Sequence, residues 1–166
     1  TVGKNVGEGI LRFGDIVGKN ACLDLYKLQN INDETSLINN TFIHQDRDSR
    51  TKVDILTLNG GMIRNEIVID LAGEGADADI NGVYLIDKKQ HIDNQVTVKH
   101  SVPNCTSNEL FKGVLNNESH AVFNGYIYVA KDAQKTNAFQ RNNNILLTAD
   151  AQIDTMPFLE IYADDV

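Results

Sequence analysis

Residues 133–165 read AQKTNAFQRNNNILLTADAQIDTMPFLEIYADD. Two short apolar bursts, residues 145–147 and 158–161, alternate here with polar segments, and no helical period runs through the stretch. An amphipathic helix would require that period. The pattern is typical of a stack of short β-strands, in which each strand leaves one layer and turns into the next. We therefore expect an all-β chain.

Similar bursts recur along the whole sequence. Many of them alternate apolar with polar residues and are rich in β-branched side chains, as half-buried strands require. Gly, Asn and Asp separate them, and these residues tolerate the irregular backbone of tight corners. Residues 23–37 have weak helical spacing, but we expect a strand at 24–28. The other expected strands are 53–58, 66–71, 80–86, 95–99, 110–115, 121–129, 144–147 and 158–162.

One internal repeat is visible, because ADINGVYLI at 78–86 matches AVFNGYIYV at 121–129. The offset from 78 to 121 is 43 residues. It predicts two rungs of roughly 20 residues each, a period in the solenoid range. Each Asn-Gly pair is also a strong β-hairpin signal. The pattern favours a solenoid, or two-faced β-stack, over a β-sandwich.

Length and charge limit the function. A chain of 166 residues is expected to form one domain, residues 1–166. The net charge of −8 disfavours nucleic acid and anionic membranes as partners, and no apolar run approaches the roughly 20 residues of a membrane helix. Two lone cysteines indicate a reducing cytoplasm. The N-terminal residues show no signal peptide and no initiator Met, which predicts an excised or processed fragment.

Two motifs resemble ligand-binding loops. Residues 73–78 match G-x-G-x-x-A, with Asp93 about 20 residues on, as in a dinucleotide fingerprint. That site needs a following helix, but another strand follows here, so a glycine-rich corner is expected. Residues 46–50 resemble the start of a calcium loop but lack its central Gly, and Thr57 stands where the bidentate Glu belongs. A solvated turn is the expected structure.

The metal-binding candidates are His100 and Cys105, from a wider group that includes His91 and Asp93. A turn at residues 103–104 would bring His100 close to Cys105, and imidazole nitrogen and thiolate are common metal ligands. Their spacing fits no standard zinc pattern. The alternative is a polar corner with a half-buried thiol.

From residue 23 on, the sequence resembles the SufD family, scaffold subunits of the Suf system for iron–sulfur cluster assembly, whose sister subunit is SufB. The resemblance lies in many segments that occur in order. They are LYKLQN (25–30), FIHQDRDSR (42–50), RNEI (64–67), LAGEGA (71–76), HIDN (91–94), PNC (103–105), ELFKGV (109–114), VFNG (122–125) and the stretch quoted first.

The resemblance implies a right-handed parallel β-helix that lacks its flanking helical regions. It implies a scaffold and not an enzyme, which pairs with a SufB-like subunit and binds the SufC ATPase through a C-terminal helical region outside this sequence. The cluster would form transiently in the full complex, and no cofactor is expected in this chain. Val166 precedes the family's Cys-Ser-His-Gly segment, so no cluster ligand is carried over.

The expected interface lies at the C-terminal end, where a SufB-like subunit or a second copy of the chain would pack. Its candidate residues are Phe158, Glu160, Tyr162, Asp164 and Asp165.

The alternative function is a carbohydrate-active solenoid enzyme. It would require carboxylates and a base to converge along one groove. The candidates for this are Asp87, Asp93, Asp132 and Lys135. The absence of Trp disfavours sugar stacking. A weaker third alternative is redox binding through Cys105.

Overall fold

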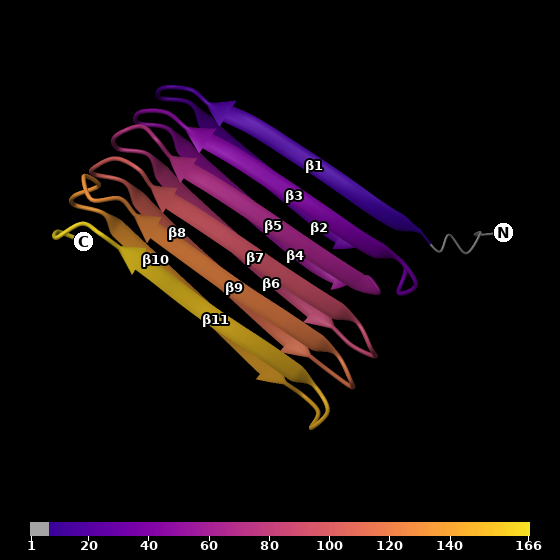
Figure 1. Cartoon of the computed structure of the whole chain (residues 1–166). Coiled ribbons are helices and arrows are strands. Elements are labelled where there is room, and N and C mark those ends of the chain that lie inside the picture. Colours follow the sequence, from indigo (N-terminus) through magenta and orange to yellow (C-terminus); the bar gives the residue numbers. More distant parts are fainter. Residues whose placement is uncertain (1–6) are drawn as a thin grey trace.

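The structure of the chain is a computed structural model, and it describes residues 7–166. Eleven strands form two sheets that pack face to face, and the chain alternates between them (Figure 1). Sheet A contains, in spatial order, β1 (Glu8–Val17), β3 (Ser36–Gln45), β5 (Met62–Leu71), β7 (His91–His100), β9 (His120–Val129) and β11 (Gln152–Ile161). Sheet B contains β10 (Asn137–Leu146), β8 (Thr106–Leu115), β6 (Asp77–Ile86), β4 (Arg50–Asn59) and β2 (Cys22–Asn30).

Every paired strand runs parallel to its neighbour, so the chain is a β-solenoid of about five turns. This confirms the expected fold class. The predicted rung length was wrong. One turn takes 26 residues from Ser36 to Met62 and 32 from His120 to Gln152. Each turn contains two strands, one in each sheet.

The 43-residue repeat therefore spans one and a half turns. It places Ala78 in β6 of sheet B and Ala121 in β9 of sheet A, each as the second residue of its strand. The Asn-Gly pair of each copy lies inside a strand, so neither makes a hairpin.

Alternation along the central strands places every second side chain between the sheets. In β7 and β9 these positions are uniformly buried. The rings of Phe111 and Phe123 meet across the core with centroids 4.9 Å apart. Gly82 makes room for this packing, because a Cβ there would lie 2.3 Å from the Phe111 ring. The core is therefore filled by aromatic and β-branched residues from both sheets.

The corners from sheet A to sheet B share one backbone feature. Each has a single residue with positive φ, a region that favours Gly, Asn and Asp. These residues are Asn20, Asp48, Gly75, Asn104 and Lys135. The expected glycine-rich corner at 73–78 and the solvated turn at 46–50 are both confirmed, and no helix follows either of them.

The expected strands all fall on observed ones, but most are too short. The observed strands have nine or ten residues, and Leu147 and Tyr162 lie just outside theirs. Strands β1 and β3 were not predicted at all. Within the described part of the chain there is no helix, and so none that could cross a membrane.

Candidate functional site

The C-terminal end of the stack is open. Within residues 7–166, strand β11 pairs only with β9 and β10 only with β8, so both present an unpaired edge (Figure 1). Leu159 and Ile161 point toward the core, in register with the buried Ile127 and Val129. They are nevertheless 58% and 43% exposed within the described residues. An unpaired edge with bare apolar side chains is suited to pairing with another strand.

Three of the predicted interface residues gather on the outer side of this end. Phe158 stacks on Tyr126, with centroids 5.4 Å apart. The carboxylate of Glu160 accepts hydrogen bonds from the hydroxyl groups of Tyr126 and Tyr162. These hydrogen bonds lower the pKa of Glu160 and raise that of Tyr126 to about 12. The cluster is thus an aromatic patch around one fixed carboxylate.

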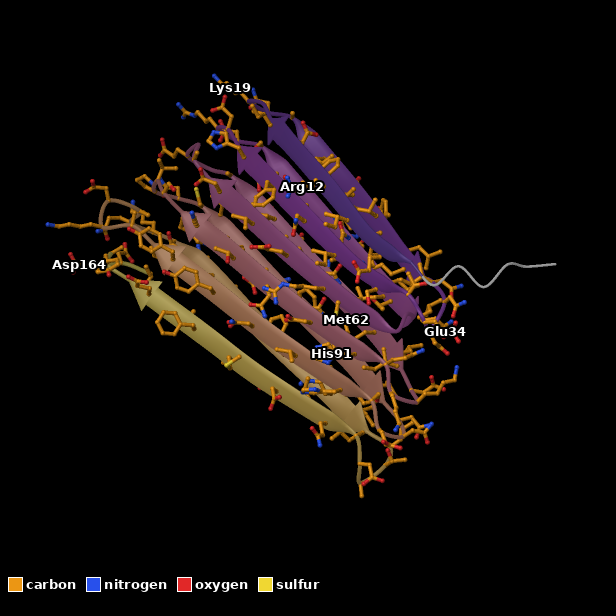
Figure 2. All side chains as sticks on the ribbon, turned by 45° about the vertical axis from the view of Figure 1, so that its right-hand side comes forward. Arg12, Lys19, Glu34, Met62, His91 and Asp164 are labelled. Carbon is orange, nitrogen blue, oxygen red and sulfur yellow. The ribbon has the colours of Figure 1, made fainter. Side chains whose placement is uncertain are left out.

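The other two predicted residues, Asp164 and Asp165, follow β11 and are exposed. Asp164 is labelled at this end of the stack in Figure 2. The backbone N–H of Asp165 donates to the Gln134 side chain at 2.9 Å, and its carbonyl accepts from the backbone N–H of Lys135 at 2.7 Å. This segment therefore closes the last corner of the stack.

Sequence reasoning missed a row of polar side chains inside this end. Gln140, Asn142 and Asn144 of β10 point toward the core, in register with inward positions of β8. Nε2 of Gln140 donates to the buried Glu109 at 2.8 Å, and Asn144 accepts from the hydroxyl of Tyr84. The sequence signal for this row was the occurrence of polar amide residues at every second position of the segment QRNNN.

Burial changes the acidity of the groups that contact this row. It raises the pKa of Glu109 to about 7 and that of Tyr84 to about 12. Oε1 of Glu109 and Nδ2 of Asn142 have no hydrogen-bond partner within the described residues. The interior of the open end is therefore polar on the sheet B side and apolar on the sheet A side.

His100 and Cys105 lie in the corner between β7 and β8. Nε2 of His100 is 2.9 Å from Oγ of Ser107, and Sγ of Cys105 donates to the carbonyl of Gly73 at 3.4 Å. Burial lowers the pKa of His100 to about 4 and raises the pKa of the Cys105 thiol. Both groups are thus neutral near pH 7. The thiol is fully buried, and not half-buried as expected.

The wider group around these two residues is not brought together. His91 and Asp93 begin β7 and point outward from sheet A, whereas His100 ends the same strand and points inward. A strand of ten residues is about 30 Å long. Among residues 7–166, no three His, Cys, Asp or Glu side chains are arranged to hold a metal ion. Metal binding by His100 and Cys105 stays a prediction.

The enzyme alternative requires four side chains to converge, and the topology separates them. Asp87 follows β6 and Asp93 begins β7, so both lie near the corners that lead from sheet B to sheet A. Asp132 and Lys135 lie between β9 and β10, in a corner at the opposite ends of the strands. These four residues therefore form no common groove.

Comparison with known proteins places the fold in a family. The family model described as "SUF system FeS cluster assembly, SufBD core domain" matches residues 13–166. The iron–sulfur cluster assembly protein SufD of Escherichia coli is 35% identical over 159 residues, which cover 93% of this chain and 37% of that protein.

Two other relatives are SufBD family proteins. The one from Mycobacterium leprae is 33% identical over 118 residues, covering 67% of this chain and 30% of that protein. The one from Synechocystis is 29% identical over 150 residues, covering 90% of this chain and 33% of that protein. The chain thus spans about a third of the length of these relatives. It belongs to the SufBD core domain family of the SUF iron–sulfur cluster assembly system.

Proposed function

We propose that this chain is the β-helix core of a scaffold subunit for iron–sulfur cluster assembly, which pairs with a SufB-like subunit through its open C-terminal end. The observation that carries this proposal is that, within residues 7–166, the edges of β10 and β11 are unpaired and the inward side chains of Leu159 and Ile161 are exposed. Pairing of strand edges satisfies the free backbone groups, and the bare apolar side chains become buried.

In this proposal the chain acts as a scaffold and not as a catalyst, and it works in the cytoplasm. The cluster is cargo that forms transiently in the assembled complex, so this chain holds no cofactor of its own. The SufC ATPase binds the full-length protein through a region outside these 166 residues. Membership of the SufBD family and the length of the relatives support this part of the proposal.

The test is co-purification of the full-length protein with a tagged SufB-like subunit and with SufC. We expect Phe158→Ser to reduce recovery of the SufB-like subunit severalfold, because Phe158 belongs to the aromatic patch at the open end. Phe42→Ser is the matched control. Phe42 lies in the same outer row of sheet A, at the other end of the stack, with similar exposure of 46% against 56%.

Equal recovery of the SufB-like subunit with both variants would exclude the open end as the pairing surface. Recovery of SufC should be unchanged by either substitution, because its binding region lies elsewhere. Thermal melts of both variants show whether any loss reflects unfolding.

A further inference from the structure

The outer face of sheet B carries a continuous apolar band that the proposed function does not use. The strand register aligns Leu28, Leu56 and Val83 in one row across β2, β4 and β6. It aligns Leu85, Val114 and Ile145 in the next row, across β6, β8 and β10. All but Val114 are among the exposed large apolar side chains. The sheet B band consists of Leu28, Leu56, Val83, Leu85, Val114 and Ile145.

The band is hollowed along its length. A hollow of about 450 Å³ is lined by Leu28, Leu56 and Val83. A second hollow, of about 480 Å³, is lined by Val83, Leu85 and Ile145. Val83 borders both, so the two hollows form one shallow groove that runs across the strands. Exposed contiguous apolar surface of this kind marks binding sites on soluble proteins.

Charges around the band are divided between its two ends. Asp24, Asp79 and Asp87 lie on or beside β2 and β6, and none of them forms an ion pair within residues 7–166. The acid on β4, Asp54, is paired with Lys52 at 3.1 Å. The outward charged residues of β2, β4 and β6 are Asp24, Arg50, Lys52, Asp54, Asp77 and Asp79, so this part of the sheet B face, the β2–β6 end, is net acidic.

The opposite end of the band is basic. Lys112 on β8 and Arg141 on β10 occupy outward positions next to the band. Neither of them forms an ion pair in the described part of the chain. The face therefore attracts cations at one end and anions at the other.

The dimensions of the band fit one helix. Five strands spaced by about 4.8 Å extend about 19 Å, and two rows on one face lie about 7 Å apart. A helix about 10 Å across with a rise of 1.5 Å per residue covers that length with about 13 residues. The band measures roughly 19 by 7 Å between its outermost rows, which is well below the area of about 800 Å² that each partner buries in a standard protein interface.

We propose that the sheet B band is the docking site for an amphipathic α-helix of a partner protein. The helix lays a stripe of Leu, Ile or Val side chains into the groove, with basic side chains over the β2–β6 end and acidic ones near Lys112 and Arg141. Recognition follows the helix-in-groove mode. The band reaches β10 but lies on the outer face of sheet B and includes no residue of the aromatic patch on sheet A, so it does not depend on the proposed function.

The probe is a synthetic 15-residue peptide with Leu at helical i, i+3, i+4 and i+7 spacing, Lys in one half and Glu in the other. Fluorescence anisotropy measures its binding to the 166-residue chain. We expect the double variant Leu56→Ser/Val83→Thr to weaken binding at least tenfold. Phe42→Ser/Val68→Thr is the matched control, because this pair is also adjacent in register on an outer face, that of sheet A. It should change binding less than twofold.

Two further peptides test the geometry and the charge. A scrambled peptide of the same composition, which has no apolar stripe, should bind at least tenfold more weakly. A peptide with the same stripe but Glu throughout should bind severalfold more weakly at low salt, because of the acids beside β2 and β6. Circular dichroism and thermal melts confirm that both double variants are folded.

Three outcomes would overturn the proposal. The first is an equal loss of binding in the two double variants, and the second is equal binding of the scrambled peptide. The third is a dimer of the chain that Leu56→Ser/Val83→Thr converts to a monomer in sedimentation experiments, since the band would then be covered by a second copy.

Discussion

His100 and Glu109 both lie in the interior with no exposed surface, and their pKa values shift in opposite directions. Burial lowers the pKa of His100 from 6.5 to about 4 and raises that of Glu109 from 4.5 to about 7. His100 therefore adds stability as the pH rises from about 4 to 6.5, because the unfolded state binds its proton more tightly. Glu109 removes stability as the pH rises from about 4.5 to 7, because the folded state keeps its proton. The two contributions largely cancel between these limits.

In the Glu109→Gln variant, the contribution of His100 to the pH dependence of stability should no longer be cancelled by that of Glu109. The Gln side chain can still accept the hydrogen bond from Gln140 but does not ionise. We expect the variant to be as stable as the parent near pH 4 and more stable at pH 8 by roughly 3 kcal/mol, the value of a pKa shift of about two and a half units. Urea unfolding from pH 4 to pH 8 measures both. A parallel pH dependence in the two proteins would show that Glu109 is not protonated in the folded state.

Cys105→Ser should reduce stability only modestly, by about 1 kcal/mol. The thiol is a small buried group, and a hydroxyl can donate to the same carbonyl of Gly73. Thermal melts with and without zinc or iron provide the test. If the melting temperature of the parent rises with metal and that of the variant does not, Cys105 is a ligand and the packing interpretation is wrong.

The chain alone should hold no iron–sulfur cluster, because such clusters usually need about four thiolates. The register of sheet B aligns Cys22 of β2 with Arg50 of β4, Asp77 of β6 and Thr106 of β8. Cys105 directly precedes Thr106. Three strand spacings therefore separate the two thiols by about 14 Å. Anaerobic reconstitution, followed by iron analysis and visible absorbance, should find no stoichiometric cluster. Near-stoichiometric iron in a stable cluster would contradict this expectation.

Among the elements, most corners contain a single residue with positive φ. Asn117, in the corner between β8 and β9, has a φ of 55°. Asn117→Gly should leave stability nearly unchanged, whereas Asn117→Val should cost about 1–2 kcal/mol, because a β-branched residue is strained in this region. Asn116→Val, one position earlier and without a positive φ, is the control. Equal losses from the two Val substitutions would show that lost polar contacts, and not backbone strain, determine the cost.

The same elements show how far the sequence could predict the fold. Alternation revealed the central strands because their inward residues are apolar, and Asn, Asp and Gly revealed the corners. Strand β3 was missed because its inward positions include Asn39, Thr41 and Gln45, which are buried and form hydrogen bonds with β2 and β6 of the opposite sheet. The inward row of β10 was missed for the same reason. Such polar residues look like surface positions until the neighbouring strand is in place.

At the scale of the whole molecule, the candidate site lies at the C-terminal end of the stack. The sequence of a single strand cannot predict which of its side chains are exposed at that end. The sequence correctly predicted the last strand near residues 158–162. It could not show that Leu159 and Ile161 point inward and lie bare, while Phe158 and Glu160 point outward. That division follows only from the register of β11 on β9. The internal repeat likewise predicted a solenoid. The number of residues in one turn could be determined only once alternate strands were assigned to opposite sheets.

The isolated chain should self-associate through its open C-terminal end. The edges of β10 and β11 offer free N–H and C=O groups, and stacked repeats need caps at their ends to remain soluble. Two copies related by a two-fold axis can pair these edges and bury Leu159 and Ile161. Light scattering over a concentration series should therefore show dimers or larger species. Leu159→Lys should shift the chain to monomer, whereas Leu56→Lys on the outer face of sheet B should not. If the parent chain stays strictly monomeric at high concentration, the open edges do not drive association. If Leu56→Lys alone abolishes association, the two copies contact each other through the sheet B band.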